Sequence, residues 1–204
     1  MERIQEALAK ARAQRQKGST QKGSATRTEY APPSEITSTV ASAWKALSPF
    51  KLNRAQLKRN RVVAGEAGRD AAPYDLLRTK IIHQAQTNGW RRVAIVSPDI
   101  GAGKTTTVAN LAFSFERQRD MRVLCLDFDL RRPSLHKALA QMTDHSMADV
   151  LDGHVRFSEH GLRLGERVAF GLNNGPAPNP SELLMSRTSR DVLDGLEEDY
   201  NQDL

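Results

Sequence analysis

The segment from Val96 to Thr107 constrains this chain more than any other, because a glycine-rich turn in it runs into a Gly-Lys-Thr triplet. A short β-branched run at 92–97 overlaps its start, and helix-forming residues fill 104–119. Strand, glycine-rich turn and helix in this order are typical of a phosphate-binding loop, in which backbone amides at a helix N-terminus point toward an anion. Pro98 stands where the strict motif has glycine. The segment predicts a nucleotide-binding site.

The chemistry of this turn assigns a role to each part of it. Gly101 and Gly103 can adopt positive φ and let the backbone approach a phosphate. Lys104 is expected to reach the terminal phosphates, and the Thr105 hydroxyl to ligate Mg²⁺. The expected nucleotide contacts are Asp99, Gly101, Ala102, Gly103, Lys104, Thr105 and Thr106.

A second constellation follows an apolar run, in the sequence Leu-Cys-Leu-Asp-Phe-Asp-Leu-Arg-Arg-Pro at 124–133. The period of a strand puts Asp127 and Asp129 on the same side, with Phe128 opposite. Carboxylates at the C-terminal end of a strand in the same unit as a phosphate loop face the metal of the bound nucleotide. Both are therefore candidate Mg²⁺ ligands, and one of them can accept a proton from a hydroxyl nucleophile.

Length and composition narrow the class of protein. The 204 residues suffice for one or two domains, and the single cysteine, Cys125, rules out a disulfide framework and favours a reducing compartment. No apolar stretch approaches the ~20 residues that span a bilayer. Residues 1–70 hold 14 Lys and Arg against 6 Asp and Glu, whereas 71–204 hold 16 against 18. The positive charge belongs to the N-terminal third.

The chain divides at about residue 70 into two expected regions. Residues 1–70 form a basic, largely flexible N-terminal region with a short amphipathic helix at 1–17 and a Gly/Ser/Pro-rich linker at 18–33. Residues 71–204 form an α/β nucleotide-binding domain with a three-layer, parallel sheet. Its expected strands are 92–97, 121–127 and 168–172, and its expected helices are 74–86, 104–119, 134–141, 147–151, 181–184 and 186–200.

These motifs together resemble the bacterial tyrosine kinases of capsule and exopolysaccharide synthesis. The resemblance rests on Gly-Ala-Gly-Lys-Thr-Thr at 101–106 and on the apolar strand that ends Asp-x-Asp-x-Arg at 127–131. It is extended by Pro-Asn-Pro-Ser-Glu-Leu-Leu at 178–184 and by the segment 147–153, so it covers about 72–204.

The resemblance implies an ATP- and Mg²⁺-dependent kinase that phosphorylates tyrosines of its own C-terminal tail and regulates polysaccharide polymerisation and export. Lys104 and Thr105 would bind phosphates and Mg²⁺, Asp127 would be the base toward tyrosine, and Asp129 would assist the metal. A membrane adaptor of the polysaccharide co-polymerase type, on a separate chain, would hold the kinase at the cytoplasmic face of the plasma membrane.

The chain departs from that family in two respects. The third acidic motif, an apolar strand that ends in Asp before Pro-Pro, would begin where the printed sequence stops, so we expect an open sheet edge and an incomplete metal site. Tyrosines number only three. The family forms rings through a Glu-x-x-Arg-x-x-Arg helix. Of that pattern this chain keeps only Arg78, so a homo-oligomer would lack the family's ring-forming contact.

Two other functions stay open. Partitioning-type ATPases share the loop but carry a signature lysine where this chain has Asp99, and a non-catalytic nucleotide-binding regulator needs only the loop. The basic region at 1–70 suits an anionic membrane surface, to which each cation near the surface contributes ~1 kcal/mol. A nucleic-acid partner is not expected, because the region has no interleaved aromatic residues.

Overall fold

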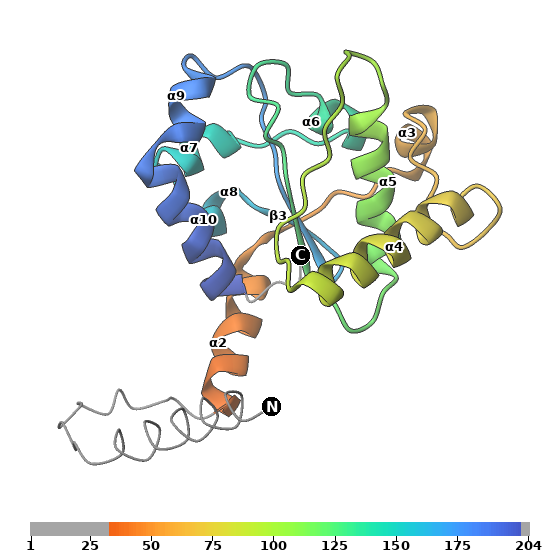
Figure 1. The fold of residues 1–204 in the computed structure, drawn as a ribbon, viewed down its shortest axis with the longest axis horizontal. Coiled ribbons are helices and arrows are strands. Elements are labelled where there is room, and N and C mark those ends of the chain that lie inside the picture. The colour runs from red at the N-terminus through yellow and green to blue at the C-terminus, as the bar shows by residue number, and fades with distance from the viewer. Residues whose placement is uncertain (1–32, 201–204) are drawn as a thin grey trace, which may run out of the picture. The chain divides into compact units, whose positions relative to one another are not determined.

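The computed structural model describes residues 33–200 of the 204-residue chain. They form an α/β fold in which helices pack on both faces of a four-stranded sheet (Figure 1). The helices are α2 Pro33–Ala46, α3 Arg54–Arg59, α4 Ala72–Asn88, α5 Lys104–Glu116, α6 Leu135–Leu139, α7 Met147–Leu151, α8 Phe157–His160, α9 Pro180–Met185 and α10 Arg187–Tyr200. The strands are β1 Ser48–Pro49, β2 Val123–Leu126, β3 Leu162–Leu164 and β4 Val168–Gly171.

The sheet has the order β1-β3-β4-β2 and mixed strand directions. β2 runs parallel to β4, with Val123 opposite Val168, and β1 runs parallel to β3. β3 and β4 form an antiparallel hairpin in which Leu164 pairs with Val168. The expected parallel pairing is present in β2–β4 and β1–β3, and the β3–β4 hairpin adds one antiparallel pair, because the short turn at 165–167 reverses the chain.

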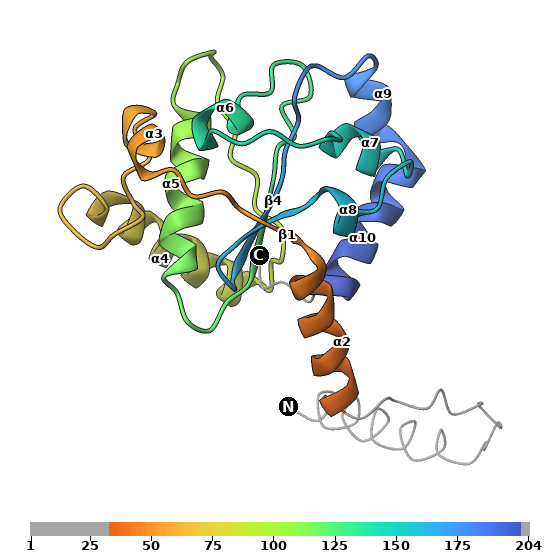
Figure 2. The same ribbon diagram turned by 180° about the vertical axis from the view of Figure 1, so that it is seen from behind.

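Alternating side chains of the central strands divide the core into two clusters. Val168 and Phe170 of β4 pack toward α4 and α5, whereas Ala169 between them packs toward α2, α7 and α10. Figures 1 and 2 show these helices on opposite faces of the sheet. This period of two produces the expected three layers of helix, sheet and helix.

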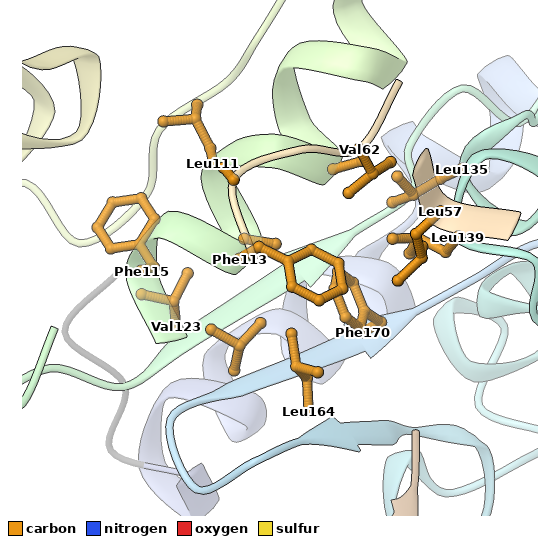
Figure 3. Packing of buried hydrophobic residues seen from close by; sticks show 14 of the residues in the cluster. Leu57, Val62, Leu111, Phe113, Phe115, Val123, Leu135, Leu139, Leu164 and Phe170 are labelled. Carbon is orange, nitrogen blue, oxygen red and sulfur yellow. The ribbon is translucent and has the colours of Figure 1, made fainter. Parts of the chain in front are cut away.

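The larger cluster holds the phosphate-loop helix α5 against the sheet. Phe113 and Phe115 of α5 are buried, and Phe50 packs edge-on against Phe113 with ring centroids 6.0 Å apart. Figure 3 shows Phe113 beside Phe170, with Leu57 and Leu139 at one end of the cluster. The apolar face of α5 thus fixes where the loop before it lies.

Residues 34–70 belong to the same compact unit as the rest of the domain, which differs from the expectation that residues 1–70 are largely flexible. Burial of apolar side chains attaches this segment to the domain. Val40 and Trp44 of α2 are buried in the cluster around Met147, and Leu57 of α3 is buried in the cluster around α5. The expected helix at 1–17 and nearly all of the linker at 18–33 lie outside the described residues.

The expected strand at 92–97 is the clearest correction. These residues form no ladder, and Val96 is 82% exposed. Both these residues and β2 line a cavity of about 490 Å³, and 92–97 is not part of the sheet. β2 is the last strand of the sheet on this side. Expected helices and strands elsewhere in 71–200 are confirmed, with ends that shift by a few residues.

Candidate nucleotide-binding site

The loop at 97–103 turns the chain directly into α5. Gly101 has φ +80° and Gly103, the N-cap of the helix, has φ +89°, so both adopt the left-handed backbone conformation that the sequence predicts. No atom lies within 4 Å of the position of a Cβ on either glycine, which shows that backbone conformation, not space, requires glycine here. The first N–H groups of the 13-residue helix face the loop, as a phosphate site needs.

The two side chains that open α5 each contact the segment that follows β2. The Lys104 Nζ lies 3.9 Å from Asp129 Oδ2, and the Thr105 Oγ1 lies 2.7 Å from Ser134 Oγ. The structure therefore brings Asp129 close to Lys104 and Thr105, although Asp129 lies 24 residues after Thr105 in the sequence.

Asp127 is held differently from Asp129. Its side chain accepts hydrogen bonds from the backbone N–H of Asp129 at 3.2 Å and of Leu135 at 3.3 Å, and the residue is 7% exposed. Burial raises the pKa of the Asp127 carboxyl, although these backbone hydrogen bonds oppose the increase. The Asp129 side chain is more exposed than that of Asp127, and it is the carboxylate that lies within ion-pair distance of Lys104.

The backbone around Asp127 is anchored on both sides. Its N–H donates to the Gly171 carbonyl at 2.8 Å, and its carbonyl accepts from the Asn173 side chain at 2.6 Å. Asn173 is fully buried and accepts from the Ala148 N–H at 3.0 Å. Hydrogen bonds therefore hold the carboxyl end of β2 against the carboxyl end of β4.

Four predicted site residues line the cavity beside β2. Lys104, Thr105, Asp127 and Asp129 share it with the chain at 91–97. Asp99 and Ala102 are exposed at the tip of the loop, where the Asp99 carbonyl accepts a hydrogen bond from the Ser97 hydroxyl at 2.9 Å. The Thr106 carbonyl accepts from the Asn110 side chain at 2.8 Å.

Ser134 is the residue that the sequence analysis missed. It precedes the short helix α6, and its hydroxyl contacts the Thr105 hydroxyl. The only sequence signal is a serine just before a helix, in Arg-Arg-Pro-Ser, which also fits an ordinary helix cap.

The donor set fits a small hard cation. Thr105 offers a hydroxyl oxygen and Asp127 and Asp129 offer carboxylate oxygens at one cavity, and Mg²⁺ prefers a few oxygen ligands together with water and substrate phosphates. Within residues 33–200, no group of three or more His, Cys, Asp or Glu side chains could form an all-protein metal cage.

Arg78, the one residue that this chain keeps from the family's ring-forming pattern, makes intramolecular contacts. Its guanidinium donates to the Ser114 carbonyl at 2.5 Å and lies 3.5 Å from Asp75. Asp75 also accepts from Ser114 and Arg117. Burial favours a higher pKa for Asp75, but these hydrogen bonds and charges outweigh it and lower the pKa. The cluster joins α4 to α5.

The fold and the loop define a P-loop nucleotide-binding domain. Residues 93–199 match the family model of the CobQ/CobB/MinD/ParA nucleotide binding domain, so the chain belongs to that family.

The curated homologues include bacterial tyrosine kinases. The tyrosine-protein kinase YwqD of Bacillus subtilis is 33% identical over 120 residues, which cover 58% of this chain and 50% of YwqD. The tyrosine-protein kinase ptk of Acinetobacter johnsonii is 30% identical over 156 residues, which cover 74% of this chain and 21% of ptk. The chain thus spans half or less of the length of these relatives.

A solved structure confirms the fold. The BceF tyrosine kinase domain superposes with a TM-score of 0.61 at 22% identity, covering 85% of this chain and 73% of that domain.

The helices of residues 33–200 include none that is long and apolar enough to span a membrane.

Proposed function

We propose that this chain is the ATP-binding domain of a bacterial protein-tyrosine kinase that phosphorylates tyrosines, its own tail included, and regulates exopolysaccharide or capsule polymerisation and export. The observation that carries the proposal is the Lys104–Asp129 contact of 3.9 Å at the cavity that Thr105 and Asp127 also line. Tyrosine-protein kinases among the relatives support the reaction class.

Each residue has a role in this proposal. Backbone N–H groups of the loop at 99–106 bind the phosphates, and Lys104 moves from Asp129 to the terminal phosphates as ATP enters. Thr105, Asp127 and Asp129 would hold Mg²⁺, which would offset the negative charge that develops during phosphoryl transfer. Asp127 would also accept the tyrosine proton, because its carboxylate lines the same cavity as Lys104.

The proposed setting is the cytoplasmic face of the plasma membrane. A separate membrane adaptor of the polysaccharide co-polymerase type would bind the kinase, and the basic residues of 1–70 would add contact with anionic lipid. A homo-oligomer is part of the proposal, but through a contact other than Arg78, because that guanidinium is engaged within the domain.

The test is phosphotyrosine formation by the full-length protein with ATP and Mg²⁺, detected by mass spectrometry. Lys104→Ala is expected to abolish both ATP binding and phosphotyrosine, whereas Lys80→Ala, an exposed lysine on α4, should change neither. ATP-driven dimerisation with hydrolysis, but without phosphotyrosine, would instead identify a partitioning-type ATPase.

A nucleotide-binding regulator without catalysis is the second candidate. The open edge of β2 favours it, because the 92–97 segment and β2 are not joined in one sheet and the site between them is wide. Binding of ATP without hydrolysis or phosphotyrosine by the full-length protein would establish this function in place of the kinase.

A further inference from the structure

Five exposed cations gather around α3 and α6, on segments that hydrogen bonds join. We call this surface the basic face; its members are Lys51, Lys58, Arg59, Arg61 and Lys137. Figures 1 and 2 both show α3 and α6 side by side next to α5.

Side-chain to backbone hydrogen bonds fix the segments that carry these cations. Gln141 binds the backbone of Lys51 in both directions, accepting from its N–H at 3.1 Å and donating to its carbonyl at 2.9 Å. Asn60 donates to the Lys137 carbonyl at 2.8 Å. The backbone of the basic face is therefore preorganised.

Asn110 connects the basic face to the phosphate-loop helix. This fully buried residue of α5 donates to the Arg61 carbonyl at 2.9 Å and accepts from the Val63 N–H at 2.7 Å. It also donates to the Thr106 carbonyl in the first turn of α5. The basic face thus has a fixed position relative to the nucleotide site.

The charge of the basic face is not neutralised within the domain. Residues 50–65 contain five Lys or Arg and no Asp or Glu, and residues 131–142 contain three Lys or Arg and none. Arg54 pairs with Glu66. Within the part of the chain that the structure describes, none of the five cations of the basic face has a salt-bridge partner.

Two exposed apolar side chains accompany the cations. Leu52 is 52% exposed and follows Lys51. Met142 is 74% exposed and follows Gln141, whose side chain hydrogen-bonds the Lys51 backbone. Exposed cations with exposed apolar side chains on the same segments suit a lipid headgroup layer, where the cations meet phosphates and the apolar side chains enter the acyl boundary. Duplex nucleic acid would bind the cations but gives Leu52 and Met142 no apolar partner.

We infer that the basic face docks on an anionic lipid surface and orients the nucleotide site relative to the membrane. This inference rests on the proposed location at the membrane and names the surface responsible. It does not depend on kinase activity, so vesicle binding and phosphotyrosine formation can fail independently.

The experiment measures binding of the full-length chain to vesicles of phosphatidylcholine with phosphatidylglycerol, against vesicles of phosphatidylcholine alone. The test variant is Lys58→Ala with Arg59→Ala. At about 1 kcal/mol for each cation near the surface, and 1.4 kcal/mol for each tenfold change, it should bind roughly 25-fold more weakly. The matched control, Lys80→Ala with Arg190→Ala, removes two exposed cations of α4 and α10 and should bind as the unaltered chain does.

Leu52→Ser tests the apolar part separately. It should weaken vesicle binding by about five- to tenfold, and this loss should persist at high salt, where the charge contribution is screened. Binding of a fluorescent ATP analogue by every variant verifies that the domain is folded.

Three outcomes would overturn the inference. Equal losses in the test and control pairs would show that total charge, not the basic face, governs binding. Vesicle binding that none of the variants reduces would place the contact elsewhere in the chain. Binding to duplex DNA or polyglutamate through Lys58 and Arg59, with no effect of Leu52→Ser on vesicles, would assign the basic face to another polyanion.

Discussion

The hydroxyl of Thr105 lies 2.7 Å from the hydroxyl of Ser134, which joins the first turn of the phosphate-loop helix to the residue before α6. The Asp127 side chain accepts a hydrogen bond from the N–H of Leu135, the residue after Ser134. The loop after β2 is therefore coupled to the phosphate loop through side chains of which Thr105 and Asp127 also line the cavity.

Replacing Ser134 by alanine tests whether this hydroxyl positions Thr105. We expect Ser134→Ala to weaken Mg²⁺-dependent ATP binding by about two- to tenfold, the effect of one hydrogen bond, because Thr105 loses its orienting partner. Binding measured without Mg²⁺ should change little. Calorimetric titration with and without the metal decides the point, and an equal loss in both conditions would show that Ser134 acts only on the fold.

Asp127 and Asp129 should differ in what they contribute to stability. Asp127→Asn should lower the free energy of unfolding by about 2 kcal/mol, because an amide N–H₂ would face a backbone donor in a buried position. Asp129→Asn should cost less than about 1 kcal/mol, because its partner Lys104 is partly exposed. Urea unfolding of both variants measures the difference, and the reverse order would contradict this account of the site.

Glu116 stabilises the β3–β4 hairpin, since its carboxylate accepts from three consecutive backbone N–H groups, those of residues 166, 167 and 168. A Cβ on Gly165 would collide with that carboxylate. We expect Gly165→Ala and Glu116→Ala each to destabilise the domain by roughly 2–3 kcal/mol. The double variant should lose less than the sum, because the collision disappears with the carboxylate. Additive losses in a double-mutant cycle would disprove the coupling.

His160 should make the domain sensitive to acid. Its Nε2 accepts from the Leu172 N–H at 3.0 Å, and burial, aided by the charge of His145, lowers its pKa from 6.5 to about 4. The unfolded chain binds a proton between these values and the folded chain does not, so stability is full above pH 6.5 and falls as the pH decreases toward 4. The loss from this residue is roughly 3 kcal/mol.

His160→Gln should flatten that dependence, because glutamine offers a neutral acceptor to the Leu172 N–H. Unfolding free energies from urea titrations at several pH values between 4 and 7 measure it. His83→Gln, on the exposed side of α4, serves as the matched control. An unchanged slope in His160→Gln would mean that other groups cause the acid sensitivity.

Local pattern was enough to predict most of the elements and four of the residues at the cavity. The helix after Gly103 and the buried strand before Asp127 follow from period and composition, and both are present. The left-handed Gly101 and Gly103 follow from the chemistry of the loop. These features depend on neighbours in the sequence, so the sequence alone specifies them.

What could not be predicted depends on contacts between distant segments. Val93 and Ile95 have strand propensity, but a strand needs a partner within hydrogen-bonding reach, and 92–97 has none in the sheet. Trp44 and Leu57 have no strong periodic pattern around them, yet they are buried by α7, α10 and α5. The contact between Ser134 and Thr105 joins two helix starts 29 residues apart.

The contrast between the two tryptophans makes the domain its own optical reporter. Trp44 is 3% exposed and packs edge-on against Tyr200, whereas Trp90 is 53% exposed and directly precedes the segment that borders the cavity. Fluorescence from Trp44 should therefore be blue-shifted and report whether α2 and α10 remain packed. Emission from Trp90 should be red-shifted and respond when the segment at 91–97 is reorganised, so one spectrum can distinguish loss of the fold from a change beside the site.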